Sequence, residues 1–169
     1  MLETPQELEC LQALLDDSMA GAGPHLRGII SDERRLDARQ LTERLTGMRL
    51  LVLATVTADG RPLAGPVDGY FLHGTFWFSS GTESVRMRHL AARPAMSATH
   101  LPGEDLAVTV HGRARCFPMG DAACAELRQA MLDEYLPKQG PAFREWLESA
   151  DALGARIEPE KIFTFHMNT

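Results

Sequence analysis

Hydroxyl side chains and a guanidinium are concentrated in one short stretch, which runs from Ser79 to Arg86 and reads SSGTESVR. Its second half opens a segment of helical character at 83–90. The start of a helix presents free backbone N–H groups that favour an anion, and hydroxyls such as those of Ser80 and Ser84 can add hydrogen bonds to it. The stretch therefore predicts a phosphate-binding site. An ordinary helix N-cap is the alternative interpretation, because serine and threonine commonly serve there.

Two arginines lie on the predicted helix, Arg86 and Arg88. Residues two apart on a helix point in different directions, so Arg86 is the stronger phosphate ligand and Arg88 the weaker one. Solvated surface charges are the alternative for both. We predict no catalytic acid or base, since Asp68 has no sequence neighbour that would tune it. The histidines are scattered without paired spacing on one helix, so no metal site is predicted.

Segments with strand character surround this stretch. They are rich in β-branched, aliphatic or aromatic residues, and several end at turn signals such as Asp59-Gly60 and His73-Gly74. Pro62 and Pro66 make the second segment irregular or partly an edge strand. The predicted strands are 50–57, 62–72, 75–78, 95–101, 106–117 and 161–166. Antiparallel strands interrupted by one short helix indicate a mainly β, α+β fold, a small closed or split β-barrel with peripheral helices.

Helices are predicted outside the strands. The first follows a capping box at Thr4-Pro5-Gln6-Glu7 and ends at the linker 21–24, and a second covers 37–46. Two more fill 121–135 and 142–150. The N-terminal helices can pack on the barrel or reach a partner subunit. We expect one domain overall, with a helical extension at 1–48 packed on a split barrel at 49–169.

Composition narrows the classes of partner. The net charge of −6 argues against nucleic acid and anionic membranes as partners. No apolar run approaches the 18 residues of a membrane helix, and acidic residues among the first twenty argue against a signal peptide. The three cysteines have no metal-knuckle spacing. A reduced, cytoplasmic setting is expected.

Three sequence patterns, taken in order, are similar to those of the flavin-binding split-barrel family related to pyridoxamine 5′-phosphate oxidase, which also includes proteins that use the deazaflavin coenzyme F-420. The patterns are Asp59-Gly60-Arg61-Pro62 with Gly65-Pro66-Val67, then Phe76-Trp77-Phe78-Ser79-Ser80, and finally Ser84-x-Arg86-x-x-His89-Leu90-x-x-x-Pro94. The last resembles the family signature Ser-x-Lys/Arg-x-x-x-Leu-x-x-x-Pro. The resemblance covers about residues 45–117, and the terminal strand agrees with it.

The resemblance implies a cofactor at a homodimer interface, with its phosphate held by Ser80, Ser84 and Arg86. Backbone groups at 65–68 would flank the isoalloxazine ring. The complete predicted cofactor-binding set is Gly65, Pro66, Val67, Asp68, Ser79, Ser80, Ser84, Arg86 and Arg88. The chain departs from the oxidase itself at Val85 and Tyr70, where the oxidase has basic residues, and at Ala107, where it has glutamine. These departures argue against pyridoxamine phosphate oxidation and leave a more general flavin or deazaflavin reductase open.

The first hypothesis for function is therefore a homodimeric, FMN-dependent oxidoreductase that transfers hydride to or from a small organic substrate. The second keeps the fold and replaces FMN with coenzyme F-420, whose longer anionic tail would need more cationic lining, which Arg61, Arg88 or Arg113 could supply. The third is a non-catalytic flavin- or haem-binding protein. Haem would need a ligand such as His111 or His166.

Overall fold

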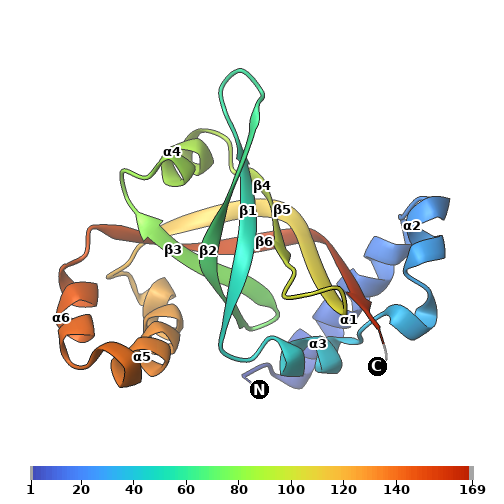
Figure 1. The fold of residues 1–169 in the computed structure, drawn as a ribbon, viewed down its shortest axis with the longest axis horizontal. Coiled ribbons are helices and arrows are strands. Elements are labelled where there is room, and N and C mark those ends of the chain that lie inside the picture. The colour runs from blue at the N-terminus through green and yellow to red at the C-terminus, as the bar shows by residue number, and fades with distance from the viewer. Residues whose placement is uncertain (1, 168–169) are drawn as a thin grey trace.

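A closed β-barrel forms the centre of the computed structural model, which describes residues 2–167 (Figure 1). Six strands within this range pair antiparallel around the barrel in the order β1-β2-β3-β6-β5-β4. Their bounds are β1 Met48–Val56, β2 Pro62–Leu72, β3 Thr75–Gly81, β4 Ala95–His100, β5 Leu106–Pro118 and β6 Ala152–His166. The predicted α+β split-barrel fold class is confirmed.

Helices lie at the ends and sides of the barrel (Figure 1). The α-helices of the described residues are α1 Pro5–Ala20, α2 Pro24–Ile29, α3 Ala38–Arg44, α4 Val85–Ala92, α5 Ala125–Gln139 and α6 Ala142–Ser149. Short 3₁₀ turns occupy η1 Asp32–Arg34 and η2 Ala122–Cys124. Within residues 2–167, no helix combines the length and apolar character that crossing a bilayer requires.

Local sequence explains the first hairpins. Along β1, Leu51 and Leu53 are buried while Leu50 and Val52 face outward, as the two-residue period of a strand requires. The β1–β2 turn places Gly60 at φ 86°, a conformation that glycine adopts without strain. The predicted tight turns and the strands that they join are present.

Two segments differ from the sequence predictions. The linker expected at 21–24 is shorter, because α2 begins at Pro24, where proline suits the first helical turn. The last strand was expected at 161–166 but begins at Ala152. Its first half carries Gly154 and Pro159, which lower strand propensity and hide the strand in the sequence.

The N-terminal helices pack against the barrel of their own chain. Leu11 and Leu15 of α1 belong to the same buried cluster as Phe76 and Ile157 of the barrel. The backbone N–H of Ile162 in β6 also donates to the Ser18 hydroxyl at 2.9 Å. Burial and hydrogen bonding thus join α1 to the last strand.

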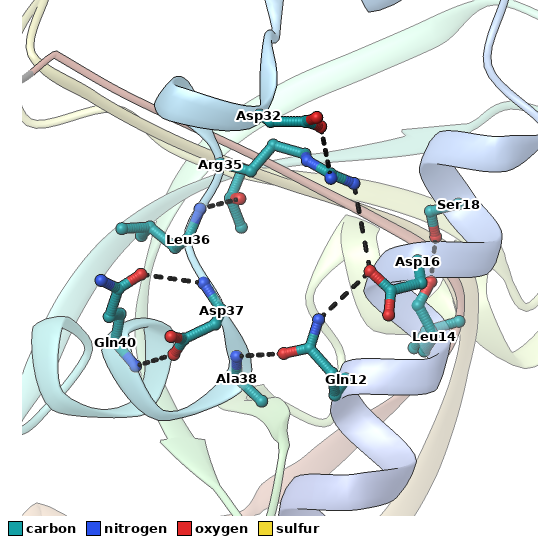
Figure 2. A network of polar contacts seen from close by, with 11 residues as sticks. Gln12, Leu14, Asp16, Ser18, Asp32, Arg35, Leu36, Asp37, Ala38 and Gln40 are labelled. Carbon is teal, nitrogen blue, oxygen red and sulfur yellow. Dashed lines mark hydrogen bonds and ion pairs between the residues drawn. The ribbon is translucent and has the colours of Figure 1, made fainter.

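A polar network connects α1 to the segment before β1 (Figure 2). Gln12 accepts a hydrogen bond from the backbone N–H of Ala38 at 2.9 Å and donates one to Asp16 at 3.2 Å. Arg35 pairs with Asp32 at 2.5 Å and lies 4.0 Å from Asp16. These bonds fix the N-terminal helices to each other.

A second buried cluster joins α5 and α6 to the outer side of β2 and β3. Its centre is formed by Tyr70 and Leu72 of β2 with Leu127 and Met131 of α5 and Phe143 of α6. In Figure 1 this helix pair stands to one side of the barrel, beside the end of β3. The helix pair and the sheet therefore bound a space next to the predicted phosphate loop.

Candidate functional site

The predicted phosphate loop lies where β3 gives way to α4. Ser84 is the N-cap of α4, and its hydroxyl accepts a hydrogen bond from the backbone N–H of Met87 at 3.3 Å. The Ser80 hydroxyl donates to the Ser84 hydroxyl at 3.0 Å. The N-cap interpretation is therefore right for Ser84. The hydroxyls of Ser80 and Ser84, the two serines proposed as phosphate ligands, lie side by side.

Arg86 connects this loop to the irregular strand β2. Its Nη2 donates a hydrogen bond to the carbonyl oxygen of Pro66 at 2.9 Å. A Cβ atom added at Gly65 would lie 3.3 Å from the same Nη2, so glycine leaves room for the guanidinium. A guanidinium has five N–H donors, and the bond to Pro66 occupies one of them. Arg86 can thus hold the strand and still offer donors to an anion.

Two further polar residues lie near the loop, Arg88 and Thr82. Arg88 lies on the exposed side of α4, away from the bond between Arg86 and Pro66. The Thr82 hydroxyl donates to Asp151 Oδ1 at 2.7 Å, and the Thr82 N–H donates to the Asp151 carbonyl at 3.1 Å. The hydroxyl of Thr82 is therefore engaged within the chain.

A cleft of about 730 Å³ opens beside the loop, between β2–β3 and the helix pair α5–α6. This volume lies within the roughly 300–1,000 Å³ of small-molecule sites. The barrel contributes four of the predicted site residues to its walls, Val67, Asp68, Ser79 and Ser80. Ser80 also bonds to Ser84 and so joins the cleft to the phosphate loop.

The opposite wall is aromatic. Tyr135 of α5 lies 5.0 Å from Phe143 of α6 between ring centroids, and Phe143 lies 5.4 Å from Trp146. The sequence analysis missed these residues because no motif marks them. The only available signal was the placement of aromatic residues in two predicted helices.

A polar pair crosses the cleft. The Tyr135 hydroxyl donates a hydrogen bond to Asp68 Oδ2. Burial is the main cause that raises the pKa of Tyr135 to about 12, and the hydrogen bond to Asp68 adds to it. The phenol is thus protonated at neutral pH and donates to the carboxylate. Ser79 faces the same helix, with its hydroxyl 3.8 Å from the Met131 sulfur.

Tyr70 lines the cleft under α5, and its side chain is 2% exposed. Among the described residues its hydroxyl has no hydrogen-bond partner. Burial chiefly raises the pKa of this phenol, and the nearby Tyr135, Asp68 and Glu134 raise it further. A neutral hydroxyl without a partner therefore lies in the cleft wall.

Charge is unevenly distributed across the site. Asp68 and Asp151 line the cleft, and within the described residues no lysine, arginine or histidine does. The guanidinium of Arg86 lies next to it, at the start of α4. The arrangement offers a cationic corner for an anionic group and an acidic, aromatic cleft beside it.

A family model described as pyridoxamine 5′-phosphate oxidase matches residues 38–165, which is most of the chain. The chain belongs to the pyridoxamine 5′-phosphate oxidase family. The match includes the barrel, the loop before α4 and the helix pair α5–α6. A search of the curated proteins finds no match.

Solved structures with the same fold belong to proteins with different functions. A haem storage protein from Vibrio cholerae has 17% sequence identity and a TM-score of 0.60, with 75% of this chain and 91% of that chain covered. A FAD-binding protein from Mesorhizobium loti has 21% identity and a TM-score of 0.55, covering 78% and 93%. An F-420 reductase has 21% identity and a TM-score of 0.54, covering 70% and 91%. These likenesses show the fold, and family members with this barrel include flavin-, deazaflavin- and haem-binding proteins.

The three positions at which the chain departs from the oxidase itself lie on different elements of the fold. Tyr70 is buried under α5, Val85 is 48% exposed at the first turn of α4, and Ala107 lies on β5. Two of the oxidase's basic positions thus carry a neutral phenol and an isopropyl group.

The two histidines considered as haem ligands differ in exposure and in hydrogen bonding. His111 is exposed on β5, and its Nδ1 lies 2.7 Å from the Ser97 hydroxyl. His166 is 7% exposed, and within residues 2–167 its Nδ1 has no hydrogen-bond partner. In the same range, no cluster of three or more histidine, cysteine, aspartate or glutamate side chains is arranged to hold a metal ion.

Proposed function

We propose that this protein is an FMN-dependent oxidoreductase that acts on a small organic substrate. The observation that carries the proposal is the cluster of Ser80, Ser84 and Arg86 against Gly65 and Pro66, next to a cleft of about 730 Å³. The junction of β3 and α4 supplies hydroxyls, charge and a helix start, which together suit a phosphate.

The residues present fit a flavin. Ser80, Ser84 and Arg86 would hold its phosphate, while the backbone of β2 at 65–68, which Arg86 contacts through the Pro66 carbonyl, would flank its ring. Arg88 is exposed on the same helix and would contribute long-range attraction. When bound, the flavin supplies hydride transfer, and the protein supplies binding and orientation. We assign no side chain as acid or base, because Tyr135 is a protonated donor to Asp68.

The active form in this proposal is a homodimer with the cofactor at its interface. Leu50 and Val52 on the outer side of β1 are 59% and 52% exposed. Val52 pairs in register with Pro66, the residue that accepts from Arg86. This apolar face therefore lies beside the phosphate corner, and apolar patches of this kind favour a protein partner.

Two measurements test the proposal. Purified protein is titrated with FMN and followed by quenching of flavin fluorescence, and sedimentation velocity gives the oligomeric state. We expect saturable binding to a dimer. Absence of FMN binding would refute the flavin function, and a monomer with full FMN occupancy would refute the placement of the cofactor at a dimer interface.

The net charge of −6 and the free cysteines support a cytoplasmic enzyme without nucleic-acid or membrane partners.

Coenzyme F-420 is the second candidate on the same fold, favoured by the structural likeness to an F-420 reductase. Its longer anionic tail needs cations beyond Arg86. Arg88 and Arg113 are exposed, whereas Arg61 is paired with Asp59 at 2.9 Å. Parallel titrations with FMN and F-420 separate the candidates by affinity.

A non-catalytic haem-binding role is the third candidate, supported by the likeness to a haem storage protein. His166 has a buried ring nitrogen without a partner, and His111 has an exposed ring. Haem is added to the wild type and to the His111→Ala and His166→Ala variants, and the Soret band is recorded. A Soret band unchanged in both variants would exclude these two ligands.

A further inference from the structure

The cleft between β2–β3 and α5–α6 differs in charge from the corner that we propose for the cofactor phosphate. Asp68 and Asp151 line the cleft, and no basic side chain of the described residues does. An anionic group entering it would meet carboxylates without a compensating cation, which is unfavourable in a partly dry site. The cleft therefore disfavours phosphorylated or carboxylated ligands.

The Asp68 carboxylate can accept further hydrogen bonds beyond the one from Tyr135. Its Oδ2 accepts the hydrogen bond from Tyr135, and a carboxylate has two oxygens with several lone pairs. The second oxygen is available to an N–H group or an ammonium. Tyr135 holds the carboxylate in place across the cleft, so this acceptor has a fixed position.

The hydroxyl of Tyr70 is a second, independent sign of a polar ligand. It is buried in the cleft wall and has no partner within residues 2–167. Buried polar groups are nearly always hydrogen-bonded, and leaving one unpaired costs about 1–3 kcal/mol. A phenol can both donate and accept, and because its oxygen is covered, a bound molecule reaches it only when the side chains that cover it move aside.

The aromatic side chains of α5 and α6 determine which shape of ligand fits the cleft. Trp146 is 55% exposed although it packs against Phe143, so one large aromatic surface remains open at the cleft. Aromatic rings favour offset-stacked or edge-to-face contacts with other rings, and they also attract cations. The wall therefore suits a flat ring system that carries positive rather than negative charge.

We infer that this cleft is the substrate subsite and that it binds a planar aromatic amine or N–H heterocycle of neutral or positive charge, with Asp68 and Tyr70 as positioning residues. The inference rests on the proposed flavin function, which places the cofactor phosphate at Arg86. It predicts that phosphorylated substrates are rejected at the cleft.

The test compares two probes that share an indole ring and differ in charge, tryptamine and indole-3-acetate. Calorimetric titrations are made on the FMN-loaded protein at pH 7. We expect tryptamine to bind about tenfold more tightly, which corresponds to about 1.4 kcal/mol. Equal affinities, or tighter binding of indole-3-acetate, would overturn the inference.

Variants assign the effect to the cleft. Asp68→Asn should reduce the preference for tryptamine about tenfold, and Trp146→Ala should weaken both probes. The matched control is Asp59→Asn, which removes the same charge from the exposed β1–β2 turn and should leave the preference unchanged. A preference that survives Asp68→Asn, or that falls equally in Asp59→Asn, would remove Asp68 from the site.

The role of the unpartnered phenol has its own variant. Tyr70→Phe keeps the ring and should weaken tryptamine several-fold. Unchanged affinity together with a higher melting temperature would make the hydroxyl a structural feature only and would remove Tyr70 from the subsite.

Failure of this inference is separable from failure of the proposed function. FMN binding that depends on Arg86, without binding of either indole, would refute the subsite alone. Tryptamine that competes with FMN would show that the cleft holds the flavin ring itself, which also refutes the substrate assignment. Asp68-dependent tryptamine binding in a protein that does not bind FMN would refute the flavin function instead.

Discussion

The guanidinium of Arg86 donates a hydrogen bond of 2.9 Å to the carbonyl oxygen of Pro66, and this bond ties α4 to the irregular strand β2. Proline removes the N–H of this position from the sheet, while its carbonyl remains an acceptor. The side chain proposed to hold the phosphate is thus already oriented by the strand proposed to flank the ring.

Replacing Arg86 with alanine should weaken FMN binding. A charge-assisted hydrogen bond contributes about 1.5–3 kcal/mol, so the dissociation constant should rise roughly tenfold to a hundredfold. Fluorescence titration measures the change. Arg88→Ala is the control on the exposed side of the same helix and should have a clearly smaller effect. Equal losses in both variants would point to general charge attraction rather than a built phosphate site.

Val52→Glu should shift the protein from dimer to monomer. The side chain is 52% exposed on the outer side of β1, and in the proposed dimer a carboxylate there would be buried without a partner. Sedimentation velocity reports the assembly state, and circular dichroism reports the fold. Ile29→Glu on α2 is the control, because Ile29 is 43% exposed away from the barrel strands. A dimer that tolerates Val52→Glu uses another surface.

His73 should make stability depend on pH. Its Nδ1 lies 3.0 Å from Glu7 of α1, and its Nε2 lies 2.5 Å from Glu126 of α5. Burial opposes the charged ring, but the hydrogen bond to Glu7 and the charges of both glutamates outweigh it and raise the pKa of His73. The contribution is therefore complete below the unfolded value of about 6.5 and is lost as pH rises through the folded value.

His73→Asn is the variant that tests this dependence. His73 has φ 53°, and asparagine tolerates such backbone angles without a titrating ring. Urea unfolding at pH 6 and pH 9 should show a deficit for the variant at pH 6 that shrinks at pH 9. A deficit of the same size at both values would mean that the ring contributes packing rather than charge.

Gly112→Ala should destabilise the barrel by about 1–3 kcal/mol, because an added Cβ would lie 2.2 Å from the backbone oxygen of Glu158. Gly112 adjoins the register shift between β5 and β6, and backbone cannot move aside as a side chain can. Urea denaturation measures the difference. Gly28→Ala in α2, where nothing lies within 4 Å of an added Cβ, should instead gain about 0.4–1 kcal/mol.

The parts of the site that lie close together in the chain were predictable from the sequence. Ser80 and Ser84 are four residues apart, and a strand end followed by a helix cap brings their hydroxyls together. The Asp59-Gly60 turn likewise depends on local backbone preference. The barrel followed from such local signals and the order of the strands.

The aromatic wall was not predictable, because its partners are distant in sequence. Tyr135 and Asp68 are brought together only when α5 packs on β2. The first half of β6 was hidden for a related reason. A Cβ at Gly154 would lie 2.5 Å from the Cys124 sulfur, so helix packing requires the glycine that weakens the strand signal.

The pairing of β6 has a consequence for biogenesis. Residues 152–156 supply the only hydrogen-bonded neighbour, within the described chain, on the edge of β3 that carries Ser79 and Ser80. During synthesis that edge stays unprotected until the final strand has left the ribosome, so the nascent barrel exposes a template for unwanted β pairing. Premature termination anywhere before Ala152 would leave the phosphate loop on an open sheet and expose the chain to aggregation or proteolysis.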